Sequence, residues 1–157
     1  MVKKTSSYVD TSAFIAFLDR SDSYHSLFRR LFSAPPQLHT SALVIAEGHG
    51  WFLRRYDAQR AIQFLAFIDA LPTLHIRAFD AEELAKTSRI VKKFADQSLT
   101  LADAHGLAIM RELRIGTCWS TDRHLALDGV PLVISAHPYR RFRRSQPIAA
   151  QPVSISP

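Results

Sequence analysis

The chain alternates between short β-favouring runs and longer stretches whose apolar residues are spaced as in amphipathic helices. In the first such pair, Ser7–Val9 is a β-favouring run, and Phe14, Ile15 and Leu18 fall at helical spacing directly after Asp10. Further strands are predicted at 37–40, 74–79, 117–121 and 131–134, and further helices are predicted to begin near Asp22, Ser41, Asp57, Asp80 and Thr100. This alternation favours an α/β fold, with a mainly parallel central sheet and helices on both faces.

Length and composition are those of an ordinary globular domain. The 157 residues, 47% of them hydrophobic, suffice for one domain whose core needs no disulfide or metal. The single cysteine, Cys118, excludes an internal disulfide and a cysteine-rich zinc site, and its apolar surroundings predict a buried, inert thiol. No apolar run approaches the roughly 18 residues of a membrane span, and no signal-peptide core follows the N-terminal lysines. We therefore expect a soluble, cytoplasmic protein.

The positive charge is concentrated near the C-terminus. The net charge is +6, and the four arginines within 140–144 supply four of these charges, which leaves +2 for the rest of the chain. From about Ala136 onward, prolines alternate with serine and glutamine. We therefore divide the chain into a domain at 1–135 and a flexible, basic, Pro-rich tail at 136–157. Arginines mixed with aromatic residues suit a phosphate backbone and stacked bases, and a solvated extension without a partner is the alternative.

Two aspartates directly follow predicted strands. Asp10 comes after the first strand and Asp122 after the strand at 117–121. Right-handed crossovers bring the carboxyl ends of parallel strands to one edge of the sheet, where α/β proteins bind their ligands. Helix capping is the alternative for Asp10, because an aspartate before a helix commonly accepts hydrogen bonds from the first amides.

A third acid, Glu47, lies on a predicted helix that begins near the same edge. It shares a face with Leu43 and Trp51, and an ionised carboxylate on such an apolar stripe is costly unless it is paired or holds a metal. An edge position that lets Glu47 reach water is the alternative.

The fourth acid, Asp103, lies in the first turn of another helix. Thr100 and Asp103 have the spacing of a capping box, while the small residues around Asp103 indicate that this turn packs against the sheet. The Asp80–Glu83 stretch also has the capping-box form, and capping is a sufficient explanation for both of its acids.

Four carboxylates gathered at one edge would repel one another strongly. Hard divalent cations remove that repulsion, because Mg²⁺ and Mn²⁺ bind carboxylate oxygens and keep several waters. Such ions also neutralise a phosphodiester, lower the pKa of a bound water and stabilise a leaving oxygen. Metal-assisted hydrolysis of a phosphodiester is the chemistry that this pattern favours.

The same residues resemble the successive motifs of a known family. YVDTSA (Tyr8–Ala13), TSALVIAE (Thr40–Glu47), LTLADA (Leu99–Ala104) and STDRH (Ser120–His124) resemble motifs of PIN-domain ribonucleases, above all VapC-type toxins of prokaryotic toxin–antitoxin pairs. No single motif is specific, but four occur in order and at family-like spacing over about residues 7–135. The resemblance implies a three-layer α/β/α fold and a Mg²⁺- or Mn²⁺-dependent endoribonuclease that leaves 5′-phosphate and 3′-hydroxyl ends. It also implies a homodimer and inhibition by an antitoxin protein.

By matching position, the resemblance makes Asp10, Glu47, Asp103 and Asp122 the catalytic, metal-binding quartet. We expect Asp10 and Asp103 to be direct ligands, and Glu47 and Asp122 to bind or orient the waters of the metal.

Five further residues are assigned weaker roles. Thr11 and Thr121 are expected to supply hydroxyls that hold the ligands in place, and Asp96 is a weaker acidic candidate. His105 and His124 flank the acids, and we expect packing or RNA contacts from them rather than metal ligation.

Two other functions fit parts of the pattern. A catalytically silent PIN-like module that binds RNA or protein is the main alternative, although it would not need four mutually repelling acids. An aspartyl-phosphate phosphatase also places an aspartate after a strand, but it requires a second aspartate two residues on, where this chain has Ser12.

Overall fold

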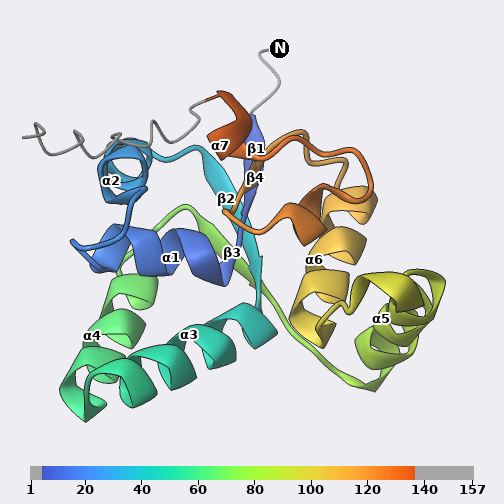
Figure 1. Ribbon diagram of the computed structural model, residues 1–157, viewed down its shortest axis with the longest axis horizontal. Coiled ribbons are helices and arrows are strands. Elements are labelled where there is room, and N and C mark those ends of the chain that lie inside the picture. Colours follow the sequence, from blue (N-terminus) through green and yellow to red (C-terminus); the bar gives the residue numbers. More distant parts are fainter. Residues whose placement is uncertain (1–4, 137–157) are drawn as a thin grey trace, which may run out of the picture.

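The computed structural model describes residues 5–136 and is built around a four-stranded sheet. The strands are β1 (Ser6–Val9), β2 (Gln37–Ser41), β3 (Leu74–Arg77) and β4 (Cys118–Trp119). Their order is β3-β2-β1-β4, and every pairing is parallel. β1 therefore lies inside the sheet, and the residues after its carboxyl end lie beside those that follow β2 and β4 (Figure 1).

Helices cover both faces of this sheet. They are α1 (Thr11–Leu18), α2 (His25–Ser33), α3 (Ala42–Arg55), α4 (Ala58–Asp69), α5 (Ala81–Lys93), α6 (Leu101–Glu112) and α7 (Val133–Ala136), with 3₁₀ turns η1 (Ala95–Gln97) and η2 (Arg123–Ala126). Helices α1, α2, α3 and α4 pack together on one side, and α5 and α6 pack together on the other (Figure 1). The predicted α/β fold with a parallel sheet between two helical layers is confirmed.

Polar side chains begin these helices where the sequence predicts. Asp10, Ser41, Asp57, Asp80 and Thr100 are the N-caps of α1, α3, α4, α5 and α6, and each accepts a hydrogen bond from an amide of the first turn. Because Asp10 directly follows β1 and Ser41 is the last residue of β2, the first turns of α1 and α3 lie at the carboxyl edge of the sheet.

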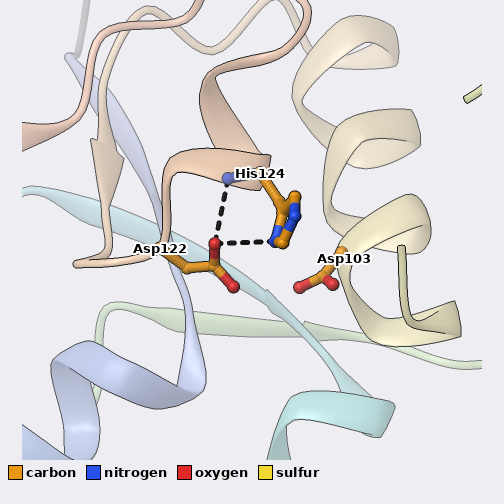
Figure 2. Close-up of side chains that lie close together, drawn as sticks. All are labelled: Asp103, Asp122 and His124. Atoms are coloured by element: carbon orange, nitrogen blue, oxygen red, sulfur yellow. Dashed lines mark hydrogen bonds and ion pairs between the residues drawn. The ribbon is translucent and has the colours of Figure 1, made fainter. Parts of the chain in front are cut away.

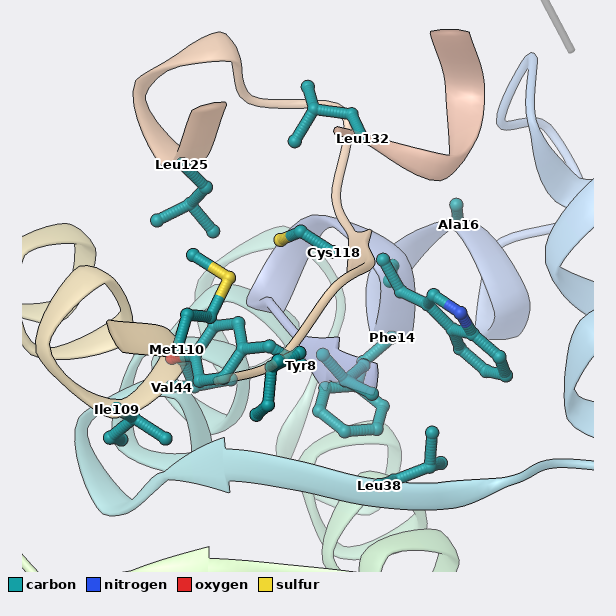
Figure 3. Packing of buried hydrophobic residues seen from close by; sticks show 14 of the residues in the cluster. Tyr8, Phe14, Ala16, Leu38, Val44, Ile109, Met110, Cys118, Leu125 and Leu132 are labelled. Atoms are coloured by element: carbon teal, nitrogen blue, oxygen red, sulfur yellow. The ribbon is translucent and has the colours of Figure 1, made fainter. Parts of the chain in front are cut away.

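The core lies between the sheet and its two helical layers (Figure 3). Tyr8 and Leu38 extend from adjacent strands and are fully buried, and so is the thiol-bearing residue Cys118, as predicted. Helix α6 approaches β1 closely, since a Cβ on Gly106 would lie 2.8 Å from Tyr8 Oη. This close approach carries the first turn of α6 to the sheet edge, as the small residues around Asp103 predict.

Two predictions about local structure are wrong. The strand predicted at 131–134 is absent: Leu132 forms one isolated bridge to Cys118, and the chain then coils into α7. The buried face of α3 is Val44, Gly48 and Phe52, not the stripe that contains Glu47. Glu47 is instead exposed at the edge of that face, which was the alternative for this residue.

Two further predictions concern membranes and the tail. Among the described residues, no helix has the length and apolar character needed to cross a membrane. The tail predicted at 136–157 lies, from residue 137 onward, outside the described residues.

Candidate metal centre

Asp10 lies at the junction of β1 and α1 and is only 6% exposed. Its Oδ2 accepts hydrogen bonds from the hydroxyl of Ser12 at 2.9 Å and the hydroxyl of Ser120 at 3.0 Å. No side chain of residues 5–136 donates a hydrogen bond to the other oxygen, Oδ1. Asp10 is thus both the cap of α1 and a carboxylate fixed by two hydroxyls, one from the first turn of α1 and one from the residue after β4.

The same hydroxyls join the ends of β1 and β4. Ser12 Oγ accepts a hydrogen bond from the amide of Thr121 at 3.0 Å, and Ser120 Oγ accepts one from the amide of Asp122 at 2.9 Å. Neither Ser12 nor Ser120 was predicted from the sequence to support a ligand, whereas the hydroxyl of Thr121 was. In the structure the backbone amide of Thr121 enters this network, and the neighbouring Ser120 supplies the hydroxyl. The sequence feature that could have indicated Ser120 is its position directly after β4 and two residues before Asp122.

Glu47 reaches the site from the middle of α3. Thr11 Oγ1 donates a hydrogen bond to Glu47 Oε2 at 2.9 Å, which bridges α1 and α3. Thr11 itself is buried, so its hydroxyl is held in place. The expected contact between the Thr11 hydroxyl and one of the four acids is present.

Asp103 belongs to a complete capping box. Its Oδ2 accepts a hydrogen bond from the amide of Thr100 at 2.9 Å, while its own amide donates to Thr100 Oγ1 at 3.1 Å. The residue is 8% exposed and faces Asp122 (Figure 2). The side chain that caps α6 is therefore the one that faces Asp122.

Asp122 and His124 complete the arrangement (Figure 2). Asp122 Oδ1 accepts from the backbone amide of His124 and lies 2.9 Å from His124 Nδ1. One ligand atom each from Asp103, Asp122 and His124 lies within 4.8 Å of the other two. The position of His124 beside the acids was predicted from the sequence, but its place among the potential metal ligands was not.

Electrostatic repulsion among the four carboxylates contributes to the pKa values of Asp10 and Glu47. Burial raises the pKa of Asp10, and the charge of Asp103 raises it further against the lowering hydrogen bonds of Ser12 and Ser120. Partial desolvation raises the pKa of Glu47, and the charges of Asp10, Asp103 and Asp122 add to this against the hydrogen bond from Thr11. Within residues 5–136, none of the four acids is ion-paired with a lysine or arginine. In the described part of the chain, the one basic side chain in contact with these acids is therefore His124, next to Asp122.

This donor set fits a hard divalent cation. Carboxylate oxygens are the ligands that Mg²⁺ and Mn²⁺ prefer, and the buried Asp10 and Asp103 are already oriented by hydrogen bonds. Burial is the main cause of the raised pKa values of Asp10 and Glu47, and a cation would offset the mutual repulsion that adds to it.

Asp96 and His105 lie apart from this arrangement. Asp96 is exposed on η1 and accepts a hydrogen bond from Gln97 at 2.8 Å. No interaction between Asp96 and the four acids is found among the described residues. His105 is fully buried, which agrees with the packing role expected for it.

His105 links two helices and the end of β2. Its Nε2 lies 3.0 Å from Glu83 Oε2 on α5, and its Nδ1 lies 2.7 Å from Ser41 Oγ, the cap of α3. Because a carboxylate only accepts, Nε2 carries the proton, and Ser41 donates to Nδ1. The capping-box interpretation of Asp80–Glu83 is thus half right: Asp80 caps α5, but the Glu83 side chain binds His105.

Comparison with known proteins gives the family. A family model described as the PIN domain matches residues 7–127. A search of curated proteins gave no match. Among solved structures, the fold is similar to VapC20 of Mycobacterium tuberculosis, described as a sarcin–ricin loop cleaving toxin, with a TM-score of 0.72 and 22% identity. That likeness covers 80% of this chain and 96% of VapC20.

Two further structures share the fold at lower similarity. A toxin–antitoxin complex from Klebsiella pneumoniae has a TM-score of 0.54 and 20% identity, over 81% of this chain and 95% of that one. VapBC2 of Rickettsia felis, bound to a DNA fragment from its promoter, has a TM-score of 0.53 and 15% identity, over 82% of this chain and 97% of that one. The family-model match spans most of the sheet and all four acids, and this chain therefore belongs to the PIN domain family.

Proposed function

We propose that this chain is a Mg²⁺- or Mn²⁺-dependent endoribonuclease and the toxin of a type II toxin–antitoxin pair. The observation that carries the proposal is geometric: Ser120 binds both the carboxylate of Asp10 and the amide of Asp122, and ligand atoms of Asp122 and Asp103 lie within 4.8 Å of each other. Among the described residues, no lysine or arginine is ion-paired with these acids or with Glu47. In the proposal, a divalent cation offsets their charge.

The four carboxylates would hold the metal. In the proposal Asp10 and Asp103 are direct ligands, and Glu47 and Asp122 bind or orient water there. When bound, the ion would neutralise the phosphodiester, lower the pKa of the attacking water and stabilise the leaving oxygen. The cation is also a condition of RNA binding, because an uncompensated acidic pocket repels a polyanion.

Hydroxyl groups of the chain would fix the ligands before RNA arrives. Ser12 and Ser120 both hold Oδ2 of Asp10, and Thr11 holds Oε2 of Glu47. The backbone amide of Thr100 does the same for Asp103. Preorganised ligands of this kind need little rearrangement on binding, which favours the strict octahedral geometry of Mg²⁺.

The descriptions of the similar solved structures support the toxin assignment. One is described as a toxin that cleaves the sarcin–ricin loop, and another is a toxin–antitoxin complex. We extend to this chain an RNA substrate, a cognate antitoxin protein, a homodimeric assembly and a cytoplasmic location.

The nuclease proposal is tested on RNA with the untagged protein, wild type and Asp10→Asn, in Mg²⁺, Mn²⁺ or chelator. We expect cleavage by the wild type with either metal, none with chelator, and a loss of about a hundredfold or more in Asp10→Asn. Asp96→Asn is the matched control, because this exposed acid lies apart from the site, and it should cleave normally. Equal cleavage in all lanes would contradict the proposal, and RNA binding without cleavage under any metal would favour a silent PIN module.

The toxin proposal is tested separately in cells. Expression of the wild type should arrest growth, Asp103→Asn should not, and the product of an adjacent small reading frame should relieve the arrest. Unimpaired growth with active wild-type protein would remove the toxin assignment and leave the nuclease chemistry standing.

A further inference from the structure

His124 lies inside the candidate metal centre rather than beside it. Its side chain is 29% exposed and extends from η2 to the same space as Asp103 and Asp122 (Figure 2). The hydrogen bond from its own amide to Asp122 Oδ1 at 2.9 Å fixes the turn that carries the ring. The imidazole therefore has a defined place next to two of the four acids.

The spacing of its ligand atoms suits a shared ion. Adjacent oxygen or nitrogen ligands of an octahedral ion with bonds of about 2.1 Å stand about 3 Å apart, and opposite ligands stand about 4.2 Å apart. His124 Nδ1 and Asp122 Oδ1 are 2.9 Å apart, and one ligand atom each from Asp103, Asp122 and His124 lies within 4.8 Å of the other two. The three side chains would therefore enter one coordination shell by moving toward a shared cation.

A nitrogen donor changes which cation the site prefers. Mg²⁺ favours oxygen ligands and water, whereas first-row transition ions accept imidazole readily. With four carboxylates alone the site would offer only oxygen, and His124 adds the one nitrogen of the set.

We infer that His124 is a direct nitrogen ligand of the divalent ion shared with Asp103 and Asp122, and that it biases the site toward Mn²⁺ over Mg²⁺. This inference rests on the metal site of the proposed function. The competing role is that His124 only donates a hydrogen bond to Asp122 and so orients this carboxylate.

Pulsed electron paramagnetic resonance of the Mn²⁺-loaded, untagged protein tests the inference without measuring activity. A ligating imidazole gives ¹⁴N modulation of the Mn²⁺ echo, so we expect this signal in the wild type and its loss in His124→Gln. His75→Gln is the matched control, because His75 is exposed on β3 and stacks on His39, and it should keep the signal. Wild type grown with ¹⁵N-histidine should exchange the ¹⁴N signal for a ¹⁵N one, which tests histidine ligation in an unaltered chain.

Calorimetric titration measures the selectivity. The ratio of the Mg²⁺ to the Mn²⁺ dissociation constant should fall by about tenfold or more in His124→Gln and stay unchanged in His75→Gln. Stoichiometric Mn²⁺ binding by the wild type without ¹⁴N modulation would overturn the inference and leave the metal site standing. No Mn²⁺ binding at all would overturn the proposed function together with it.

Discussion

Thr11 Oγ1 donates a hydrogen bond to Glu47 Oε2 across 2.9 Å, and this bond joins the first turn of α1 to the middle of α3. Thr11 directly follows Asp10, so one turn of chain holds two of the four acids: Asp10 through the backbone junction and Glu47 through this hydroxyl. Glu47 is otherwise exposed, and the bond restricts a long side chain that would sample several rotamers in water.

Removal of the Thr11 hydroxyl should weaken metal binding. We expect Thr11→Val to raise the Mn²⁺ dissociation constant by about tenfold, since loss of a group that orients a metal ligand costs this much or more. Thr11→Ser should restore most of the affinity. Thr121→Val is the comparison, because no hydrogen bond of the Thr121 hydroxyl is found in the described part of the chain. A larger loss in Thr121→Val than in Thr11→Val would show that the wrong hydroxyl has been assigned.

Neutralising Asp10 should stabilise the metal-free protein at neutral pH. Burial, reinforced by Asp103, raises the pKa of Asp10 in the folded chain above the value of about 3.9 in the unfolded chain. The folded state therefore binds the proton more tightly, and the ionised form lowers stability above the folded pKa. This penalty disappears as the pH falls below the unfolded pKa.

The measurement is the melting temperature of wild type and Asp10→Asn in chelator between pH 7 and pH 4. We expect Asp10→Asn to melt a few degrees higher at pH 7, and the difference to shrink toward zero at about pH 4. Added Mn²⁺ should reverse the order at pH 7, because it binds only the wild type tightly. If Asp10→Asn melted at a lower temperature than the metal-free wild type at pH 7, ionised Asp10 would not destabilise the fold, which would contradict the prediction.

Alanine substitutions at two glycines should change stability in opposite directions. Gly106 lies where α6 approaches β1, whereas Gly50 lies on α3. A Cβ at position 106 would lie 2.8–2.9 Å from the ring and hydroxyl of buried Tyr8, so Gly106→Ala should cost about 1–3 kcal/mol. Gly50→Ala meets only the flexible end of Arg54, at 3.0 Å, and should gain about 0.5–1 kcal/mol of helix stability. Denaturant unfolding measures both, and equal effects would mean that α6 does not pack on Tyr8 as described.

The buried contacts of His105 should matter for stability. His105→Leu leaves Ser41 and one oxygen of Glu83 without their partner in the interior, so we expect a loss of about 1–3 kcal/mol. Glu82→Gln removes only an exposed ion pair with Lys86 and should change the free energy of unfolding by less than about 0.5 kcal/mol. A neutral His105→Leu variant would show that the network contributes no net stability.

The order of elements could be predicted because the first two strands run directly into residues that cap the next helix. Asp10 and Ser41 each stand at the end of a strand and cap the following helix. The local sequence therefore indicates where the strand ends, and with it which residues lie at the carboxyl edge of the sheet. The strand expected at 131–134 failed because a short apolar run does not distinguish strand from helix. At that point the chain makes one bridge, at Leu132, and then coils.

Side-chain partners were harder to predict than elements. Asp103 and Glu83 both occupy the third position after a helix cap; Asp103 bonds back to its cap amide, whereas Glu83 turns to His105 on a neighbouring helix. That choice depends on a contact between residues far apart in the sequence, which spacing does not reveal. The supporting hydroxyl of Ser120 and the place of His124 among the ligand atoms were missed for the same reason.

Calorimetric titration of Mn²⁺ into the wild type and single Asn variants tests most directly whether distant acids form one metal site. We expect the wild type and Asp96→Asn to bind with the same affinity. Asp10→Asn and Asp103→Asn, which alter acids from different helices, should each weaken binding by more than about tenfold. Unchanged binding in both of these variants would place the metal elsewhere and contradict the account.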